Sequence, residues 1–297
     1  MKKLGLIIAI LIICGLFTSC LGSKGTVKGV VVVGAKDFTE QYILGYMLTL
    51  FIEANTNLTV SYMRNLATDV LFAATRTGAV DLYTEYTGTV YGSYLKYSDT
   101  RSYQEVYEIS SRELTERYDL RMLDLLGFNN TYALAVRADT AAEHNLKTIS
   151  DLARVSSNFI LGGHAEFFNR FDGLPNLKII YDMTFMEERV VYGSERYNAL
   201  INDEVQVIMV FSTDGMLLGA DLIVLEDDKI FFPAYEGVII IRNEIMEKHP
   251  ELSEVLNRLA GLLTDEVMRN LNYRVDVMGE SPRDVAEWFL MINNLLK

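Results

Sequence analysis

The stretch Asp81-Leu-Tyr-Thr-Glu-Tyr-Thr-Gly-Thr89 lies between an apolar run and the helical pattern of residues 90–95. We expect a strand that ends by presenting Tyr86, a turn through Gly88 and then the start of a helix. Such a corner can bind a small molecule, because Tyr86 presents a ring face while Thr89 and the helix amides can donate hydrogen bonds to an anion. The alternative is that Tyr86 only packs in the core, and this stretch by itself leaves both interpretations open.

Strand and helix patterns alternate around this stretch. The β-branched run of residues 30–35 is typical of a fully buried strand. From there the sequence predicts a helix at 42–54, a strand at 58–63, a helix at 68–77 and a strand at 79–83. This order predicts a parallel sheet with right-handed crossovers, whose ligands bind at the carboxyl ends of its strands. Lys36 follows the first strand, so we expect it to face the same crevice as Tyr86 and Thr89.

A second alternating unit follows the irregular segment at 128–132, after a predicted helix at 103–118 and strand at 120–126. Its predicted elements are strands at 132–136, 159–162, 205–211 and 222–225, with helices at 148–155 and 195–202. The chain then returns to a strand at 238–241 and ends in helices. The sequence therefore predicts an α/β fold made of two units.

The first residues have the features of an export signal. Lys2 and Lys3 precede an apolar run, residues 4–17, that is too short to span a bilayer comfortably. The run ends in Phe-Thr-Ser-Cys20, which resembles the lipobox of bacterial lipoproteins, where the cysteine is lipidated. We predict a signal peptide at 1–19, a lipidated tether at 20–26 with Cys20 as anchor, and an extracytoplasmic location on a bacterial membrane. The alternative is a retained N-terminal anchor.

Cysteine usage and charge exclude several classes of function. Cys14 and Cys20 are the two cysteines, so the mature chain would have no disulfide, no thiol nucleophile and no cysteine metal site. The formal charge is −13, and removal of Lys2 and Lys3 with the signal peptide takes it to about −15. A chain this acidic argues against nucleic-acid binding, which needs a basic face.

The sequence contains no arrangement of residues typical of catalysis. His144, His164 and His249 have no partners at metal-ligand spacing. Neither a glycine-rich phosphate loop nor a Gly-x-Ser-x-Gly motif occurs. Ser212-Thr-Asp214 could suggest a nucleophile, but a helix cap at a strand end explains these residues better. We expect no enzyme activity, no cofactor and no metal.

Several motifs, in order along the mature chain, are long enough to be specific. They are Ala35-Lys-Asp-Phe-Thr-Glu-Gln-Tyr-Ile-Leu44, Glu85-Tyr-Thr-Gly-Thr89, Gly127-Phe-Asn-Asn-Thr-Tyr-Ala-Leu-Ala-Val136, Phe211-Ser-Thr-Asp-Gly215, Val224-Leu-Glu-Asp-Asp-Lys229 with Phe231-Phe-Pro233, and Leu271-Asn-Tyr-Arg-Val-Asp276. They resemble the substrate-binding proteins of osmoprotectant ABC transporters, a quaternary-ammonium-binding family whose members bind glycine betaine, carnitine, choline and relatives.

The resemblance implies a two-lobed periplasmic-binding-protein fold of type II. In that fold two α/β lobes flank a ligand cleft, the chain crosses between them twice, and a hinge closes them over the ligand. Carried over to this sequence, lobe 1 is expected at 27–130 and 236–297, and lobe 2 at 131–235.

The resemblance also implies an aromatic box for the ligand's quaternary ammonium head. The matching residues here are Tyr86, Tyr132, Phe211 and Tyr235. A quaternary ammonium has no N–H to donate, so attraction to ring faces, about 0.5–2 kcal/mol per good contact, is its main specific handle. Relatives usually carry tyrosine where this chain has Phe211, which keeps the ring face and loses the hydroxyl.

For the carboxylate of a betaine, the resemblance implies binding by Lys36, Thr89 and Arg170. A zwitterion such as glycine betaine would satisfy both ends of the cleft, whereas choline would leave Lys36 and Arg170 enclosed without a counter-charge. Burying unpaired charge costs several kcal/mol. We therefore expect betaine-type zwitterions to bind at least about tenfold more tightly than choline.

The expected function is a lipid-anchored solute-binding protein that captures a quaternary ammonium osmoprotectant and delivers it to an ABC permease. The alternative is a chemosensory or surface lipoprotein that uses the same fold without transport. A hydrolase is a third reading, for which the catalytic residues are missing.

Overall fold

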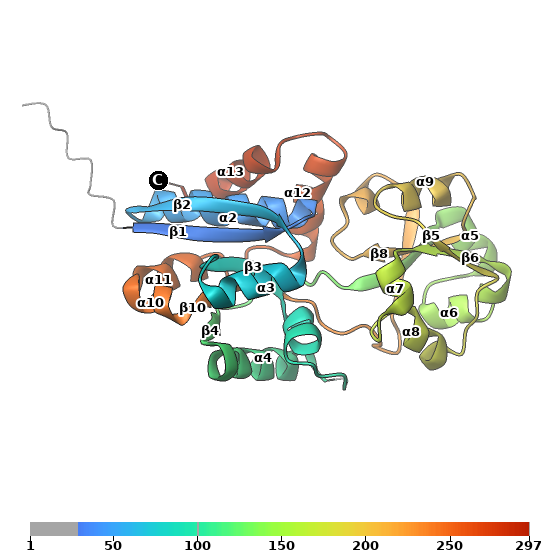
Figure 1. Cartoon of the computed structure of the whole chain (residues 1–297). Helices are drawn as coiled ribbons and strands as arrows, with labels where there is room; N and C mark the ends of the chain where they lie inside the picture. The colour runs from blue at the N-terminus through green and yellow to red at the C-terminus, as the bar shows by residue number, and fades with distance from the viewer. Residues whose placement is uncertain (1–28, 100, 297) are drawn as a thin grey trace, which may run out of the picture.

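The computed structural model describes residues 29–99 and 101–296. The predicted signal peptide, the tether and Cys20 lie outside these residues. Two sheets organise the described chain, and Figure 1 shows them side by side, each with its own helices. Within the described residues, no helix combines the length and the apolar character needed to cross a membrane.

The first sheet contains the quoted stretch and has the strand order β2-β1-β3-β10-β4. Its strands are β1 (Gly29–Lys36), β2 (Leu58–Leu66), β3 (Leu82–Tyr86), β4 (Leu120–Met122) and β10 (Gly237–Arg242). As the alternation predicts, β1 pairs in parallel with β2 and β3, whereas β10 runs antiparallel to β3 and β4. The predicted strands at 79–83 and 120–126 differ from β3 and β4. β3 starts later because the amides of Ala79 and Val80 still donate to Ala74 at the end of α3 (Thr68–Thr77).

The second sheet repeats the plan of the first, with the order β7-β6-β8-β5-β9. Its strands are β5 (Tyr132–Arg137), β6 (Ile160–Gly163), β7 (Glu187–Val190), β8 (Val207–Phe211) and β9 (Leu222–Leu225). β6 is parallel to β7 and β8, and β5 is antiparallel to β8 and β9. In both sheets, three parallel strands are therefore followed by one that runs the opposite way.

Helices pack against both sheets. Those of the first unit are α2 (Thr39–Asn55), α3, η1 (Thr89–Tyr94), α4 (Tyr103–Tyr118), α10 (Asn243–Lys248), α11 (Glu251–Asn257), α12 (Asp265–Asp276) and α13 (Pro282–Ile292). Those of the second are α5 (Ala138–His144), α6 (Ile149–Ala153), η2 (Ser156–Asn158), α7 (Ala165–Asn169), α8 (Leu174–Tyr181), α9 (Glu195–Ile201) and η3 (Gly215–Leu218).

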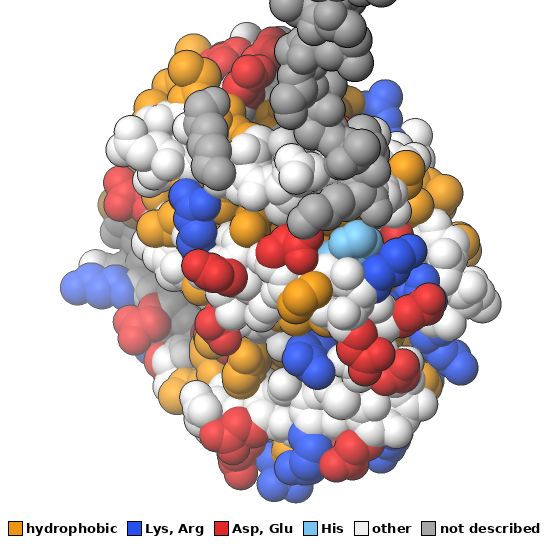
Figure 2. All heavy atoms as spheres, turned by 90° about the vertical axis from the view of Figure 1, so that its left-hand side faces the viewer, with side chains coloured by type: hydrophobic (Ala, Val, Ile, Leu, Met, Phe, Trp, Pro, Cys, Tyr) orange, Lys and Arg blue, Asp and Glu red, His pale blue; other side chains and the backbone are white. Residues whose placement is uncertain are grey.

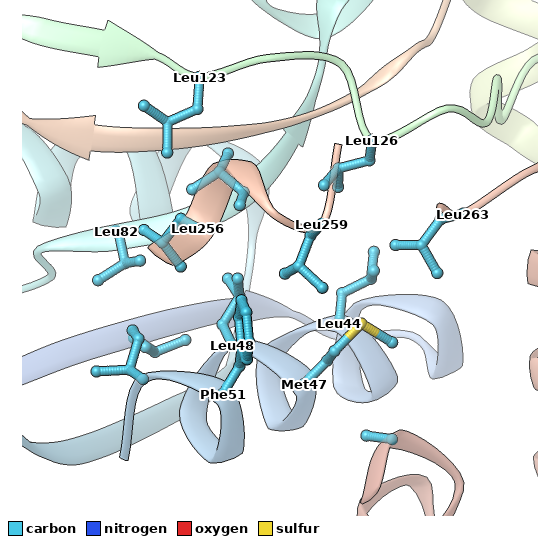
Figure 3. Packing of buried hydrophobic residues seen from close by; sticks show 14 of the residues in the cluster. Leu44, Met47, Leu48, Phe51, Leu82, Leu123, Leu126, Leu256, Leu259 and Leu263 are labelled. Atoms are coloured by element: carbon cyan, nitrogen blue, oxygen red, sulfur yellow. The ribbon is translucent and has the colours of Figure 1, made fainter. Parts of the chain in front are cut away.

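The largest core lies between α2 and the returning C-terminal helices. Leu44, Met47, Leu48 and Phe51 recur at helical spacing, so they form one buried stripe along α2. Figure 3 shows this stripe facing leucines from the first sheet and from the segment around α11. Separate clusters of buried residues lie on the two faces of the second sheet. Each sheet thus has its own core, and the space between the sheets is available for a cleft.

The chain crosses between the sheets twice, before β5 and before β10, and the two crossing segments are bonded to each other. Asn129 and Glu236 form an antiparallel bridge. The Asn130 amide donates to the Tyr235 carbonyl across 3.0 Å. A Cβ at Gly237 would lie 2.3 Å from the Phe128 ring, so this position requires glycine. The two segments form one short ribbon rather than two independent linkers.

Gly88 does not form the turn that the sequence suggested. Its backbone is already helical, with φ −65° and ψ −33°, so the chain passes from β3 into the following helix without a turn. Glycine is needed there because a Cβ would lie 2.4 Å from the carbonyl oxygen of Ala234. The quoted stretch therefore packs directly against the second crossing segment.

The surface of the first lobe carries mixed charge. On the face shown in Figure 2, acidic and basic side chains are interspersed with apolar ones rather than gathered by sign.

Candidate ligand-binding site

One cavity of about 730 Å³ lies at the facing edges of the two sheets. Its lining includes all seven side chains predicted for ligand binding: Lys36, Tyr86, Thr89, Tyr132, Arg170, Phe211 and Tyr235. The structure therefore brings these residues together, although they come from both sheets and from the crossing segments. Their roles toward a ligand stay a prediction.

Three rings of the predicted box form a cluster, two of them on the second sheet and the third, Tyr235, in the second crossing segment. The Tyr132 ring lies 5.3 Å from that of Phe211 and 6.3 Å from that of Tyr235, measured between centroids. β5 and β8 pair Tyr132 directly with Phe211, which fixes the first of these contacts. All three rings line the cavity, and the face of such a ring is the part that attracts a cation.

Tyr86, at the end of β3, belongs to the opposite sheet. Its hydroxyl donates to Glu40 across 2.7 Å and accepts from the Gln41 side chain across 3.1 Å. The Lys36 ammonium lies 5.1 Å from the centre of its ring. The ring of Phe38, which also lines the cavity, is nearly parallel to it at 6.4 Å. Tyr86 is therefore held in one orientation.

Glu40, which was not among the predicted site residues, orients Tyr86. This buried carboxylate also accepts from the side-chain amides of Asn130, at 2.8 Å, and Asn272, at 3.1 Å. Asn272 in turn donates to the carbonyl of Thr213, beyond β8, across 2.8 Å. Burial raises the pKa of Glu40 above its usual value, and these hydrogen bonds oppose that rise. The network joins α2, a crossing segment, α12 and the second sheet.

Lys36 is not an unpaired cation, contrary to our expectation. Its ammonium forms a buried ion pair with Glu85 in the quoted stretch. Glu85 also accepts from the backbone amide of Tyr86 across 2.9 Å and from the hydroxyl of Tyr94. The pairing follows from strand order, because β1 and β3 are neighbours and both residues lie near strand ends.

Arg170 has a counter-charge as well. Its Nε and Nη2 donate to the two oxygens of Asp172, each across 2.7 Å, and Nη2 also lies 2.9 Å from the Tyr235 hydroxyl. The predicted penalty for choline assumed that Lys36 and Arg170 would be enclosed without partners, and that reason is wrong. Within the described residues, Nη1 of Arg170 has no protein acceptor, so it can still donate to a ligand carboxylate.

The charges in the lining favour a cationic ligand group. Five carboxylates line the cavity, against three lysine and arginine side chains. The carboxylates are Asp37, Glu40, Glu166, Asp214 and Asp276, and the cations are Lys36, Arg170 and Arg196. Because Glu85 and Asp172 neutralise two of the three cations, the local balance is negative. Local charge of this kind attracts a positively charged head group.

Three further lining residues were also missed: His164, Tyr192 and Arg196. His164 directly follows β6, and Tyr192 follows β7 by two positions. The rule that selected Lys36, a position at the end of a parallel strand, would have selected His164, which follows the strand predicted at 159–162. It would have missed Tyr192, because no strand was predicted at 187–190. Arg196 lies in α9, and the sequence pattern gave no sign of its burial.

Comparison with known proteins shows similarity over most of the chain. The family described as the substrate binding domain of ABC-type glycine betaine transport systems, OpuAC, matches residues 29–291. The chain is 34% identical to the carnitine transport binding protein OpuCC of Listeria monocytogenes, covering 99% of this chain and 97% of that protein. It is 37% identical, over 87% of its length, to the ergothioneine transport permease/ergothioneine binding protein EgtU of Helicobacter pylori, and spans 47% of that relative.

A solved structure shows the same fold. The crystal structure of a glycine betaine/carnitine/choline ABC transporter protein is 32% identical and has a TM-score of 0.83, covering 90% of this chain and 100% of that one.

Proposed function

This chain belongs to the family of substrate-binding domains of ABC-type glycine betaine transport systems, and on that premise we propose that it captures a quaternary ammonium osmoprotectant and delivers it to an ABC permease. The family consists of binding proteins rather than enzymes. The predicted two-lobed α/β periplasmic-binding-protein fold is confirmed by the similarity to a solved member.

The cavity carries this proposal. Tyr132 and Phe211 from the second sheet, Tyr86 from the first and Tyr235 from the crossing segment line a space whose charged lining is negative in balance. Ring faces and a negative field both stabilise a trimethylammonium group, which cannot be bound by N–H donation. These four rings are proposed to hold the ligand's head.

The proposed ligand is a betaine-type zwitterion, with Lys36, Thr89 and Arg170 toward its carboxylate. Support for this end comes from the donor capacity that remains on Arg170 and from the position of Thr89 at the start of η1. Carnitine and ergothioneine, which occur in the names of two relatives, both combine a trimethylammonium group with a carboxylate. A betaine carboxylate can accept hydrogen bonds that choline cannot, and the proposed preference over choline rests on these bonds. It does not rest on unpaired charge, because Lys36 and Arg170 already have carboxylate partners.

We propose the two lobes as residues 27–130 with 236–297, and residues 131–235. The division agrees with the membership of the two sheets, which change at the two crossing segments. We further propose that Cys20 carries a lipid that anchors the protein to a bacterial membrane outside the cytoplasm, on the periplasmic side or the cell surface, as the sequence of the leader indicates.

Thermal unfolding of the purified protein with a ligand panel tests the binding function. A ligand at about 100 times its dissociation constant adds about 2.7 kcal/mol to the free energy of unfolding. We expect glycine betaine, carnitine, ergothioneine or choline to raise the melting temperature, and proline and ectoine to leave it unchanged. A shift with proline or ectoine alone would overturn the proposal.

Transport and sensing can be separated in cells. In a strain from which the gene is deleted, we expect uptake of the labelled ligand to fall. Unchanged uptake with a lost chemotactic response would instead support the alternative, a chemosensory or surface lipoprotein.

A further inference from the structure

Four rings at one edge of the second sheet follow the order of its strands. Tyr192 lies just beyond β7, His164 just beyond β6, Phe211 ends β8 and Tyr132 begins β5. β7, β6 and β8 are parallel, and β5 is antiparallel to β8. The carboxyl ends of the first three strands and the start of β5 therefore lie at the same end of the sheet, and so do all four rings. Neighbouring centroids are 5.4, 5.9 and 5.3 Å apart along this row. The separations are close to the spacing of about 4.8 Å between adjacent strands.

The row reaches beyond the predicted box. Tyr132 and Phe211 belong to the box, whereas His164 and Tyr192 continue the row past Phe211, and all four rings line the same cavity. The cavity volume, about 730 Å³, lies within the range of roughly 300–1,000 Å³ that accommodates drug-sized ligands. In glycine betaine a single methylene separates the head from the carboxylate. A head held at Tyr132 would leave His164 and Tyr192 without a ligand contact.

The hydrogen-bond partners of His164 define its tautomer. Nη1 of Arg196 lies 2.9 Å from Nε2 of His164. A guanidinium can only donate, so Nε2 must accept and the proton of the neutral ring is on Nδ1. Burial and the charge of Arg196 both lower the pKa of His164, in agreement with a neutral ring. Within the described residues, Nδ1 has no protein acceptor, and His164 can therefore donate to a ligand.

Arg196 is itself fixed in place. It is 4% exposed, it forms an ion pair with Asp214, and its Nη1 donates to the carbonyl of Gly193 across 2.8 Å. Asp214 also accepts from the hydroxyl of Tyr197 and from the backbone amide of Phe211. The orientation of His164 is thereby tied to the strand that carries a ring of the box.

We propose that His164 and Tyr192 form a second subsite, which binds the tail of an elongated betaine whose hydrogen-bond acceptor lies several bonds from its ammonium. The proposal rests on the proposed function and concerns betaines longer than glycine betaine in the same cavity. The head lies in the same four-ring box, the tail runs along the row, and the carboxylate at its end receives the Nδ1–H of His164 in place of the contacts with Lys36, Thr89 and Arg170 proposed for glycine betaine. Arg196 is a positioning residue, because it acts through His164.

Two betaines that differ in chain length test the subsite by calorimetry. γ-Butyrobetaine has three methylenes between the head and the carboxylate, and glycine betaine has one. The substitution His164→Phe keeps an aromatic ring at this position and removes both ring nitrogens. We expect it to weaken γ-butyrobetaine about tenfold, the effect of losing a hydrogen bond to a charged group, and glycine betaine less than about twofold. His164→Asn, whose amide can place an N–H near the Nδ1 position, should restore most of the lost affinity.

Tyr192→Ala provides a second, independent variant. Tyr192 is 54% exposed, so its loss leaves the core intact, and γ-butyrobetaine should again be weakened selectively. Ile179→Ala, at an exposed residue of α8 outside the cavity lining, is the control and should bind both ligands as the unmodified protein does.

The outcomes separate the subsite from the proposed function. If both variants weaken the two betaines equally, or weaken neither, the subsite is wrong while the proposed function stands. The subsite is also wrong if the unmodified protein binds glycine betaine but not γ-butyrobetaine. If the unmodified protein binds no quaternary ammonium compound, the proposed function fails together with the subsite.

Discussion

The hydroxyl of Tyr86, at the end of β3, donates to Glu40, in the first turn of α2, across 2.7 Å. This contact sets the direction in which the Tyr86 ring faces the cavity. The same carboxylate accepts from Asn130 in a crossing segment and from Asn272 in α12. The orientation of the Tyr86 ring and the position of the crossing segment at Asn130 therefore both depend on the Glu40 carboxylate.

Glu40→Gln is expected to reduce both the stability of the fold and the affinity for the ligand. Glutamine has a similar size, but its NH₂ group donates, so one of the present donors loses its acceptor. A buried donor without an acceptor costs about 1–3 kcal/mol, and we expect the free energy of unfolding in urea to fall by that amount. Choline affinity by calorimetry should fall about tenfold. Glu116→Gln, at an exposed site on α4, is the control, and unchanged choline affinity in Glu40→Gln would contradict the prediction.

Asp172→Asn should increase the preference for zwitterions. Asp172 neutralises Arg170, so its replacement by asparagine leaves a guanidinium that a betaine carboxylate can compensate and choline cannot. We expect the ratio of glycine betaine to choline affinity to rise about tenfold, measured by calorimetry. Asp182→Asn, an exposed change in the same lobe at a left-handed position that asparagine tolerates, should leave the ratio unchanged. An unchanged ratio in Asp172→Asn would mean that Arg170 does not face the carboxylate.

His164 should make stability depend on pH below its usual pKa of 6.5. Burial and Arg196 of α9 lower its pKa in the folded chain, against the weaker opposing effects of Asp214 beyond β8 and Glu166 of α7. Between the folded pKa and 6.5 the unfolded chain binds more protons, so stability falls as the pH drops through this window and then levels off. Urea unfolding from pH 7.5 to 5 should show the loss in the unmodified protein and less of it in His164→Phe. An equal loss in both proteins would contradict this assignment.

Ligand binding should bring the two lobes closer together. The bridge between Asn129 and Glu236 joins the crossing segments into one ribbon, which favours rotation of the lobes about a shared hinge. Small-angle X-ray scattering should give a smaller radius of gyration when glycine betaine saturates the protein. Tyr132→Ala, which should bind poorly, is the control, and an unchanged radius in the saturated protein would argue against closure.

The anchor can be tested on protein isolated from native membranes. Mass spectrometry of the N-terminal peptide should show a lipid-modified Cys20 and no residues before it. Replacement Cys20→Ala should release the protein from the membrane fraction. An unmodified peptide that begins at Met1 would overturn the lipoprotein prediction.

Sequence patterns predicted the parts of this structure that depend on chain direction and periodicity. The β-branched run of β1 and the stripe of α2 are such features. The positions of Lys36 and Tyr86 near strand ends then placed both in the cavity. The pairing of Lys36 with Glu85 depends on which strands are neighbours and on rotamers, so alternation alone did not reveal it. The role of Glu40 needed four separate segments to meet, which a linear pattern cannot show.

The agreement of the ring row with strand order has a consequence for how the ligand of this chain could change. Backbone hydrogen bonding sets the distance between the strand positions that carry the rings, and side-chain substitution does not alter that distance. Mutation can exchange the side chain at Phe211 or His164, but the two positions remain on neighbouring strands. Under the proposed subsite, this end of the sheet offers rings to a ligand in fixed increments. Selection for a longer or shorter solute would act by adding or removing a ring at one increment, without remodelling the lobe.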